Sequence, residues 1–155
     1  MDELDSAIVR ELQLDGRQSN RDLARRLGVA PSTCLERVRQ LRHRGVLRGF
    51  RAEVDLAKLD RGFQAFVATQ IRPLSRSVID AFQAWAVGRP EVLAVYVLAG
   101  TDDFLVHVAV QNSERLHGFL VDALAQRREV VSFRTQVIYQ QASNPVISPL
   151  PAERT

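Results

Sequence analysis

The sequence predicts an α+β protein with an N-terminal winged-type helix-turn-helix domain and a C-terminal ferredoxin-like βαββαβ domain. Three observations predict it. Apolar residues recur at helical spacing over the first 50 residues, strand and helix patterns alternate from residue 63, and ten of the 21 basic residues lie in one block of 36 residues. The chain has 155 residues, of which 46% are apolar and 25% charged, so it has room for two small folded domains.

Residues 1–50 are predicted to form three helices. The apolar face of the first helix consists of Leu4, Ala7, Ile8 and Leu12. Ser19 begins the second helix in a capping box with Asp22. Gly28 ends this helix, because glycine readily adopts the left-handed conformation. The short turn that follows is typical of a helix-turn-helix unit.

The third helix is predicted to begin at Pro31, whose missing N–H would be unpaired in the first turn anyway. Its inner stripe is expected to be Cys34, Leu35, Val38 and Leu41. At about 100° per residue, the outer face then presents Ser32, Thr33, Glu36, Arg37 and Gln40. These side chains can read base edges in the major groove of DNA, and a solvated polar face is the alternative.

The charge is distributed unevenly along the chain. Residues 1–15 carry one base and five acids, residues 16–51 carry ten arginines and two acids, and the remainder is almost neutral. Such a basic block is typical of a polyanion-binding module, although solvated charge on a small helical domain is the alternative. The second helix starts inside this block, and a helix N-terminus favours an anion. Phosphate contacts are therefore predicted for Arg17, Ser19, Asn20 and Arg21.

Residues 51–62 are expected to be a strand and linker, the strand pattern running from Phe50 to Val54. The ferredoxin-like domain follows over residues 63–141. Its first three strands are expected at 64–71, 92–98 and 104–110, and in its last strand Val131, Phe133, Thr135, Val137 and Tyr139 share one face. One helix is expected at 77–87, and a second, capped by Ser113, carries Leu116, Phe119, Leu120 and Leu124. Residues 142–155 are expected to be an irregular tail.

The two predicted helices cover one face of an antiparallel sheet and leave the other face bare. Apolar and aromatic residues on both faces of the strands therefore predict that a second subunit packs on the sheet. The lone cysteine, Cys34, excludes an intramolecular disulfide and fits a reducing cytoplasm. No apolar stretch approaches the ~20 residues that span a membrane, and the three histidines are scattered. We expect no cofactor, metal site, catalytic residue or membrane partner.

Motifs in both domains resemble the Lrp/AsnC (feast/famine) family of transcription regulators, over about residues 2–141. They are Leu27-Gly28, Cys34-Leu35-Glu36-Arg37-Val38, Gly45-Val46-Leu47-Arg48-Gly49-Phe50, Pro90-Glu91-Val92 and Gly100-Thr101-Asp102-Asp103-Phe104. The resemblance implies a head that binds double-stranded DNA and a domain that binds an effector and oligomerises, as dimers that often assemble into octamers. Two departures are Ala30, where many relatives have Ser, and Arg128-Glu129 in place of a Pro-Gly pair.

The polar turn at residues 100–103 separates two apolar strands. Its adjacent acids repel each other and need a nearby cation or backbone donors, and a plain hairpin is the alternative interpretation. In the family this turn lies at a subunit interface and helps to bind an amino-acid effector. The resemblance therefore implies effector contacts for Gly100, Thr101, Asp102, Asp103 and Thr135.

The predicted function is a sequence-specific transcription regulator modulated by an amino acid or a related small molecule. An enzyme of the siroheme-type tetrapyrrole decarboxylase class, which resembles the family in both domains, is one alternative. Such an enzyme needs histidines in its pocket, and His107 and His117 match no such motif. A non-specific architectural DNA-binding protein is the other alternative.

Overall fold

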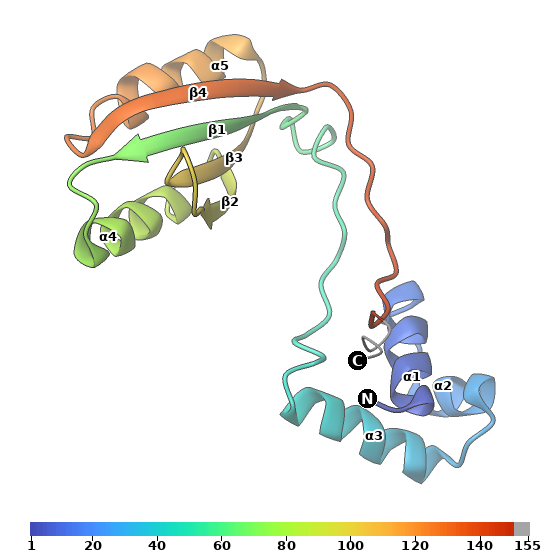
Figure 1. Cartoon of the computed structure of the whole chain (residues 1–155). Helices are drawn as coiled ribbons and strands as arrows, with labels where there is room; N and C mark the ends of the chain where they lie inside the picture. Colours follow the sequence, from blue (N-terminus) through green and yellow to red (C-terminus); the bar gives the residue numbers. More distant parts are fainter. Residues whose placement is uncertain (151–155) are drawn as a thin grey trace. The chain divides into compact units, whose positions relative to one another are not determined.

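The computed structural model describes residues 1–150, which divide into two compact units (Figure 1). Among the described residues, 1–53 and 142–150 form one unit, the head, and Val54–Gln141 form the other, the sheet domain. Within the described residues, no helix is both long and apolar enough to cross a membrane.

The head contains the three predicted helices, α1 (Glu3–Leu14), α2 (Asn20–Leu27) and α3 (Pro31–His43). Its core consists of Ile8, Leu12, Leu23, Ala24, Cys34 and Leu41. The prediction that Leu35 belongs to the inner stripe is wrong, because this side chain is 38% exposed. Leu35 lies about 100° around the helix from Cys34, whereas residues 38 and 41 return to the same side.

Side chains and glycine define the ends of these helices. The Ser19 Oγ accepts a hydrogen bond from the Asp22 N–H at 3.1 Å, which confirms the predicted cap of α2. Gly28 ends α2 with a φ of 67°, also as predicted. Ala30 precedes α3 without any side-chain cap, so this helix begins with Pro31 but lacks the hydrogen bond that a serine would accept.

The strand predicted over residues 50–54 is absent, and the head has no β wing in its described residues. Phe50 and Val54 are 44% and 56% exposed, and no neighbouring strand is available to pair with this segment. Residues 142–150 form no helix or strand, as expected, and the rest of the predicted tail lies outside the described residues. The Gln13 side-chain amide exchanges two hydrogen bonds with the main chain of Ile147, each 2.9 Å long.

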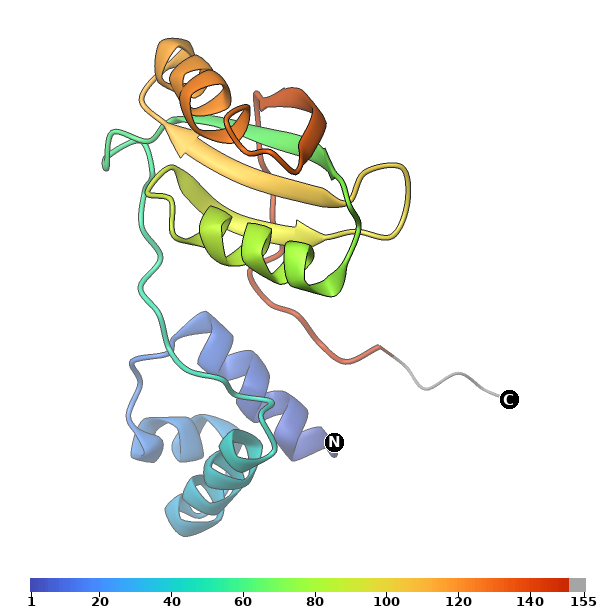
Figure 2. The same cartoon turned by 90° about the vertical axis from the view of Figure 1, so that its left-hand side faces the viewer.

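The sheet domain has the predicted βαββαβ order. Its strands are β1 (Phe63–Ile71), β2 (Val92–Val97), β3 (Phe104–Val110) and β4 (Val130–Ile138), and its helices are α4 (Arg76–Val87), α5 (Ser113–Gly118) and the π-helical η1 (Phe119–Leu124). The strands form one antiparallel sheet in the order β2-β3-β1-β4, and the helices lie on the same side of it (Figure 2). This topology confirms the ferredoxin-like fold.

The core of the sheet domain lies between the sheet and these helices. It comprises Ala65, Val67, Ile71, Phe82, Ala86, Phe104, Val106, Val108, Val110, Leu116, Phe119 and Leu124. Every second residue of β3, from Phe104 to Val110, therefore faces this core. In β4 a bulge pairs Ile71 with Val130, which turns Val131 outward to 62% exposure, contrary to prediction. Tyr139 follows the end of β4 and is 98% exposed.

The second helix of the sheet domain begins one residue earlier than predicted. The Asn112 side chain, not Ser113, caps α5 by accepting a hydrogen bond from the Arg115 N–H at 2.9 Å. The opposite face of the sheet has no helix. Phe66, Leu105 and Tyr96 lie on this face according to the strand register, and Tyr96 is 49% exposed.

Candidate DNA-binding and effector sites

The outer face of α3 presents four of the five residues predicted to read DNA. Ser32, Thr33, Glu36 and Gln40 are all exposed. Gln40 Nε2 donates to Glu36 Oε1 at 3.0 Å, one helical turn away, so the amide and the carboxylate are held side by side. An amide and a carboxylate can hydrogen-bond adenine and cytosine edges respectively, and the two hydroxyls are adaptable.

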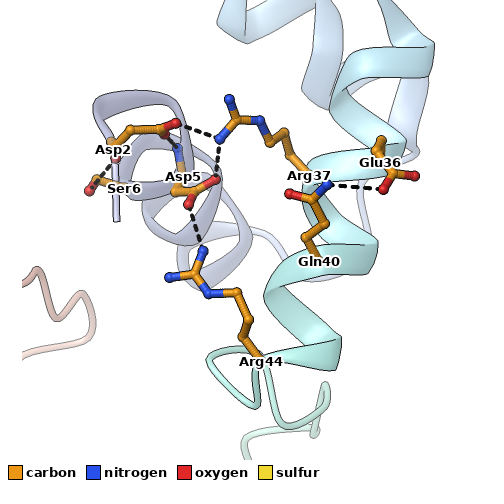
Figure 3. A network of polar contacts seen from close by, with 7 residues as sticks. All are labelled: Asp2, Asp5, Ser6, Glu36, Arg37, Gln40 and Arg44. Carbon is orange, nitrogen blue, oxygen red and sulfur yellow. Dashed lines mark hydrogen bonds and ion pairs between the residues drawn. The ribbon is translucent and has the colours of Figure 1, made fainter.

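Arg37, the fifth predicted residue, points towards α1 (Figure 3). Its Nη1 donates to Asp2 and also to Asp5 Oδ1, the latter at 3.1 Å. Arg44 Nη1 donates to the other oxygen of Asp5 at 3.1 Å. We call Asp2, Asp5, Arg37 and Arg44 the acid–arginine cluster.

The cluster shifts the pKa values of its exposed members. A hydrogen bond from the Asp5 N–H, together with the Arg37 guanidinium, holds the pKa of the Asp2 carboxyl below its ordinary value. The hydrogen bonds to Asp2 and Asp5 raise the pKa of Arg37 in turn. A side chain held in this way is directed away from the solvent-facing side of α3.

The residues predicted to contact phosphate at the start of α2 are divided between two roles. Arg17 and Arg21 make no ion pair within residues 1–150, and Arg21 is exposed. The Ser19 hydroxyl donates to the Asp22 carboxylate at 2.6 Å in addition to capping the helix. Asn20 Nδ2 donates to the Pro31 carbonyl at 2.8 Å and so joins the starts of α2 and α3.

At the turn between β2 and β3, both acids have the compensating donors that the sequence analysis required. Asp103 Oδ2 accepts from the Ile71 N–H at 2.8 Å and from Arg72 Nη1 at 3.0 Å. Asp102 Oδ2 accepts from Arg134 Nη2 at 2.6 Å. These donors come from the end of β1, from Arg72 directly after it, and from β4, and only the folded sheet brings them to the turn.

Thr135 is not joined to this turn. It pairs across the sheet with Val67, and among residues 1–150 no hydrogen bond links it to residues 100–103. Gln70 contacts the turn instead. Its Nε2 donates to the Thr101 carbonyl at 2.7 Å, and its Oε1 accepts a hydrogen bond from the Ser132 hydroxyl.

A hollow of about 380 Å³ lies beside Arg72, the partner of Asp103. Its lining consists of Arg72, Pro73, Ser77, Val78, Ala81, Arg127, Arg128 and Glu129. Arg128-Glu129 stands out in the sequence as a departure from the Lrp/AsnC pattern, whereas Arg72 and Arg134 were not predicted as site residues. Only the register of the strands brings these arginines to the acidic turn, and no local motif signals it.

Three other residues have structural roles. Cys34 is fully buried, and burial raises the pKa of its thiol. Trp85 packs against Phe82 at 5.5 Å between ring centroids. His107 lies on the uncovered sheet face, stacked on Phe66 and hydrogen-bonded to Gln64 at 3.0 Å. Within residues 1–150, no group of three or more His, Cys, Asp or Glu could hold a metal ion.

A helix-turn-helix head followed by a separate ferredoxin-like domain defines a two-domain DNA-binding transcription regulator. Residues 1–42 match the model of the AsnC-type helix-turn-helix domain, and residues 64–145 match that of the Lrp/AsnC ligand-binding domain. The chain belongs to the Lrp/AsnC family of transcriptional regulators.

Relatives and solved structures agree with this assignment. The chain is 39% identical to the transcriptional regulator AldR of Mycolicibacterium smegmatis, over 90% of this chain and 82% of the relative. It is 33% identical to the leucine-responsive regulatory protein of Rhizobium meliloti, over 93% and 92% of the two chains. A Neisseria meningitidis transcriptional regulator, solved as a complex with L-Met, matches with a TM-score of 0.87 and 28% identity, over 97% and 96% of the two chains.

Proposed function

We propose that this protein regulates transcription by reading a specific DNA sequence with α3, and that an amino acid bound in the sheet domain modulates its DNA affinity. The exposed polar side chains on the outer face of α3 support the proposal that this helix reads DNA. Ser32, Thr33, Glu36 and Gln40 contact base edges, whereas Arg17 and Arg21 contact phosphates. Ser19 and Asn20 act through the end of α2, whose first N–H groups point along the helix axis.

The effector is proposed to bind at the turn 100–103 and the neighbouring hollow. Arg72, Arg127 and Arg128 offer guanidinium groups for a carboxylate, and Glu129 offers an acceptor for an ammonium group. The volume of about 380 Å³ lies within the range of small-molecule sites. The L-Met complex of the Neisseria relative supports an amino acid as the ligand class. Thr135 completes the site only if a second subunit contributes it.

We propose that the protein is a homodimer, and that dimers assemble further into an octamer. The helix-free face of the sheet, with Phe66, Leu105 and Tyr96, is the surface offered to the second subunit. Light scattering at micromolar concentration should then give at least twice the 17.4 kDa mass of the chain. A mass of one chain would refute this part. The protein is proposed to act in the cytoplasm and to catalyse no reaction.

Duplexes enriched from a random library by the parent protein provide the test of DNA reading. Gln40→Ala should weaken binding to the enriched duplex by about 1–3 kcal/mol and relax the preference at one base pair. Arg21→Ala should weaken binding to all duplexes alike and reduce the salt slope by about 0.9. If no sequence is enriched although DNA binds, the protein is a non-specific architectural binder.

Thermal melts with each of the common amino acids test effector binding. A ligand at 100 times its dissociation constant adds about 2.7 kcal/mol to the free energy of unfolding. Asp103→Ala should remove this response and leave DNA binding without effector unchanged, because the turn lies in the other domain. The proposal fails if no amino acid shifts the parent melt, or if the Asp103 variant responds as the parent does.

A further inference from the structure

We propose that Asp5 is a specificity-determining residue, which holds Arg37 of the DNA-reading helix and Arg44, the residue directly after this helix, away from DNA phosphates. This inference rests on the proposed DNA-reading function of α3. It assigns to Arg37 a role different from the base contact predicted from sequence, and it gives the acidic first helix a part in recognition.

Asp5 is unusual for a charged residue because it is 3% exposed. Among the described residues, it is the one charged residue that belongs to the buried class. A carboxylate removed from water needs paired cations or hydrogen-bond donors, since its desolvation costs several kcal/mol otherwise. The buried Asp5 carboxylate therefore requires its ion pairs with Arg37 and Arg44, and these pairs hold the two side chains beside α1.

The geometry uses both oxygens of the carboxylate. Asp5 Oδ1 accepts from Arg37 and Asp5 Oδ2 from Arg44, each at 3.1 Å. Arg44 caps the C-terminal end of α3 in helical conformation, seven residues after Arg37, which is about two helical turns, so the two arginines lie on one side of the helix. Asp5 thus binds α3 at two points along its axis, and Asp2 adds a second acceptor for Arg37 (Figure 3).

Without the Asp5 carboxylate, Arg44 would lose its one ion pair within residues 1–150, and Arg37 would keep only its pair with the exposed Asp2. The side chains of Arg37 and Arg44 are 34% and 48% exposed, so neither is enclosed by other residues. Arg44 would then be a mobile cation at the end of the helix that meets DNA, and Arg37 would be held by one exposed pair, which is weak in water, instead of two. Arginine binds phosphate well, and such contacts add affinity for every sequence alike.

Specificity is the ratio between affinities for the selected sequence and for other DNA. By engaging two arginines inside the head, Asp5 limits the sequence-independent part of binding. The same contacts hold α3 against α1, so the outer residues Glu36 and Gln40 keep one orientation towards base edges. Both effects raise the specificity ratio.

Asp5→Asn tests the proposal, with Glu3→Gln as the matched control. Glu3 lies on the same helix, is exposed, and makes no side-chain hydrogen bond or ion pair within residues 1–150, so its variant changes the net charge equally without touching an arginine. Affinities for the enriched duplex and for a scrambled duplex are measured between 50 and 200 mM salt. Circular dichroism and the melting temperature report whether each variant is folded.

We expect Asp5→Asn to bind the scrambled duplex more tightly than the parent does. Its salt slope should steepen by about 0.9 for each arginine that reaches a phosphate. The affinity ratio between enriched and scrambled duplexes should fall, while Glu3→Gln keeps the parent ratio. The proposal is overturned if Asp5→Asn and Glu3→Gln have the same ratio and slope. A parent protein that prefers no duplex would instead refute the DNA-reading function itself.

A second pair of variants keeps the test valid if Asp5→Asn does not fold. Arg37→Gln and Arg44→Gln remove the cations, and both should leave the salt slope of the parent unchanged, because neither arginine contacts a phosphate in the proposed complex. A decrease of the slope by about 0.9 in either variant would show that this arginine binds phosphate in the parent, and would overturn the proposal.

Discussion

The sheet domain and the head are each stabilised internally by a different kind of contact. In the sheet domain, main-chain hydrogen bonds run between β1 and both of its neighbours, and twelve buried side chains fill one core. In the head, the main-chain hydrogen bonds lie within single helices or their ends, and the core has six buried side chains. Side chains alone therefore join the helices of the head to one another.

This difference explains why polar contacts are distributed as they are. In the head they connect separate helices, as in the bonds from Asp5 to Arg37 and Arg44 and from Asn20 to Pro31. In the sheet domain, the pairs of Asp102 and Asp103 lie at the end of a sheet that the backbone already holds. The helices of the head therefore depend on side-chain contacts for their arrangement, whereas the strands of the sheet are held by main-chain hydrogen bonds.

The largest expected effect concerns the small core of the head. Leu41→Ala removes a fully buried side chain and should lower the free energy of unfolding of the head by about 2–5 kcal/mol. Because the sheet domain has its own core, its amide resonances should stay dispersed in NMR spectra while those of the head collapse. Loss of both sets of resonances would show that the two units do not fold separately.

A smaller effect on the free energy of unfolding distinguishes a side-chain hydrogen bond between helices of the head from one within the sheet. Asn20→Ala removes the hydrogen bond to the Pro31 carbonyl and should cost about 0.5–1.5 kcal/mol, measured by urea unfolding of the head. Gln70→Ala is the matched change in the sheet, where the ladder persists, and should cost a few tenths of a kcal/mol. Equal costs would contradict the distinction between the two units.

One substitution in the head should increase its free energy of unfolding. Ala30 precedes α3 without a side-chain cap, and its φ and ψ of −64° and 141° already suit a capping residue. Ala30→Ser should therefore stabilise the head by about 0.5–1 kcal/mol, seen as a higher urea midpoint with an unchanged m-value. A lower midpoint would mean that the start of α3 cannot accommodate the hydroxyl.

The smallest expected effect is a pH response of the sheet domain. Burial lowers the pKa of His107 in the folded protein, so between the folded pKa and the ordinary value of about 6.5 the unfolded state binds more protons. The stability associated with neutral His107 is therefore complete above about pH 6.5 and is lost as the pH falls through the folded pKa. Urea midpoints between pH 8 and 5 should show this decline, and His107→Gln should lessen it. An equal decline in both proteins would assign it to other groups.

The sequence by itself determined the order and type of nearly all helices and strands. Period-3.6 and period-2 apolar patterns located α1 to α4 and the four strands to within one or two residues, because burial of one face dictates those patterns. Capping residues and Gly28 located the ends of α2 for the same local reason. The prediction of a strand at residues 50–54 was wrong, because an alternating pattern does not provide a neighbouring strand for hydrogen bonding.

Tertiary structure decided what the candidate site residues touch. Arg37 has the same local spacing whether it faces DNA or α1, and only the packing of α1 on α3 brings Asp5 within 3.1 Å of it. In the same way, the need of Asp103 for a donor could be predicted, but its partner Arg72 depends on sheet register. Side-chain patterns encode which face is buried, whereas the partners of charged groups are set by elements distant in the chain, about which a local pattern carries no information.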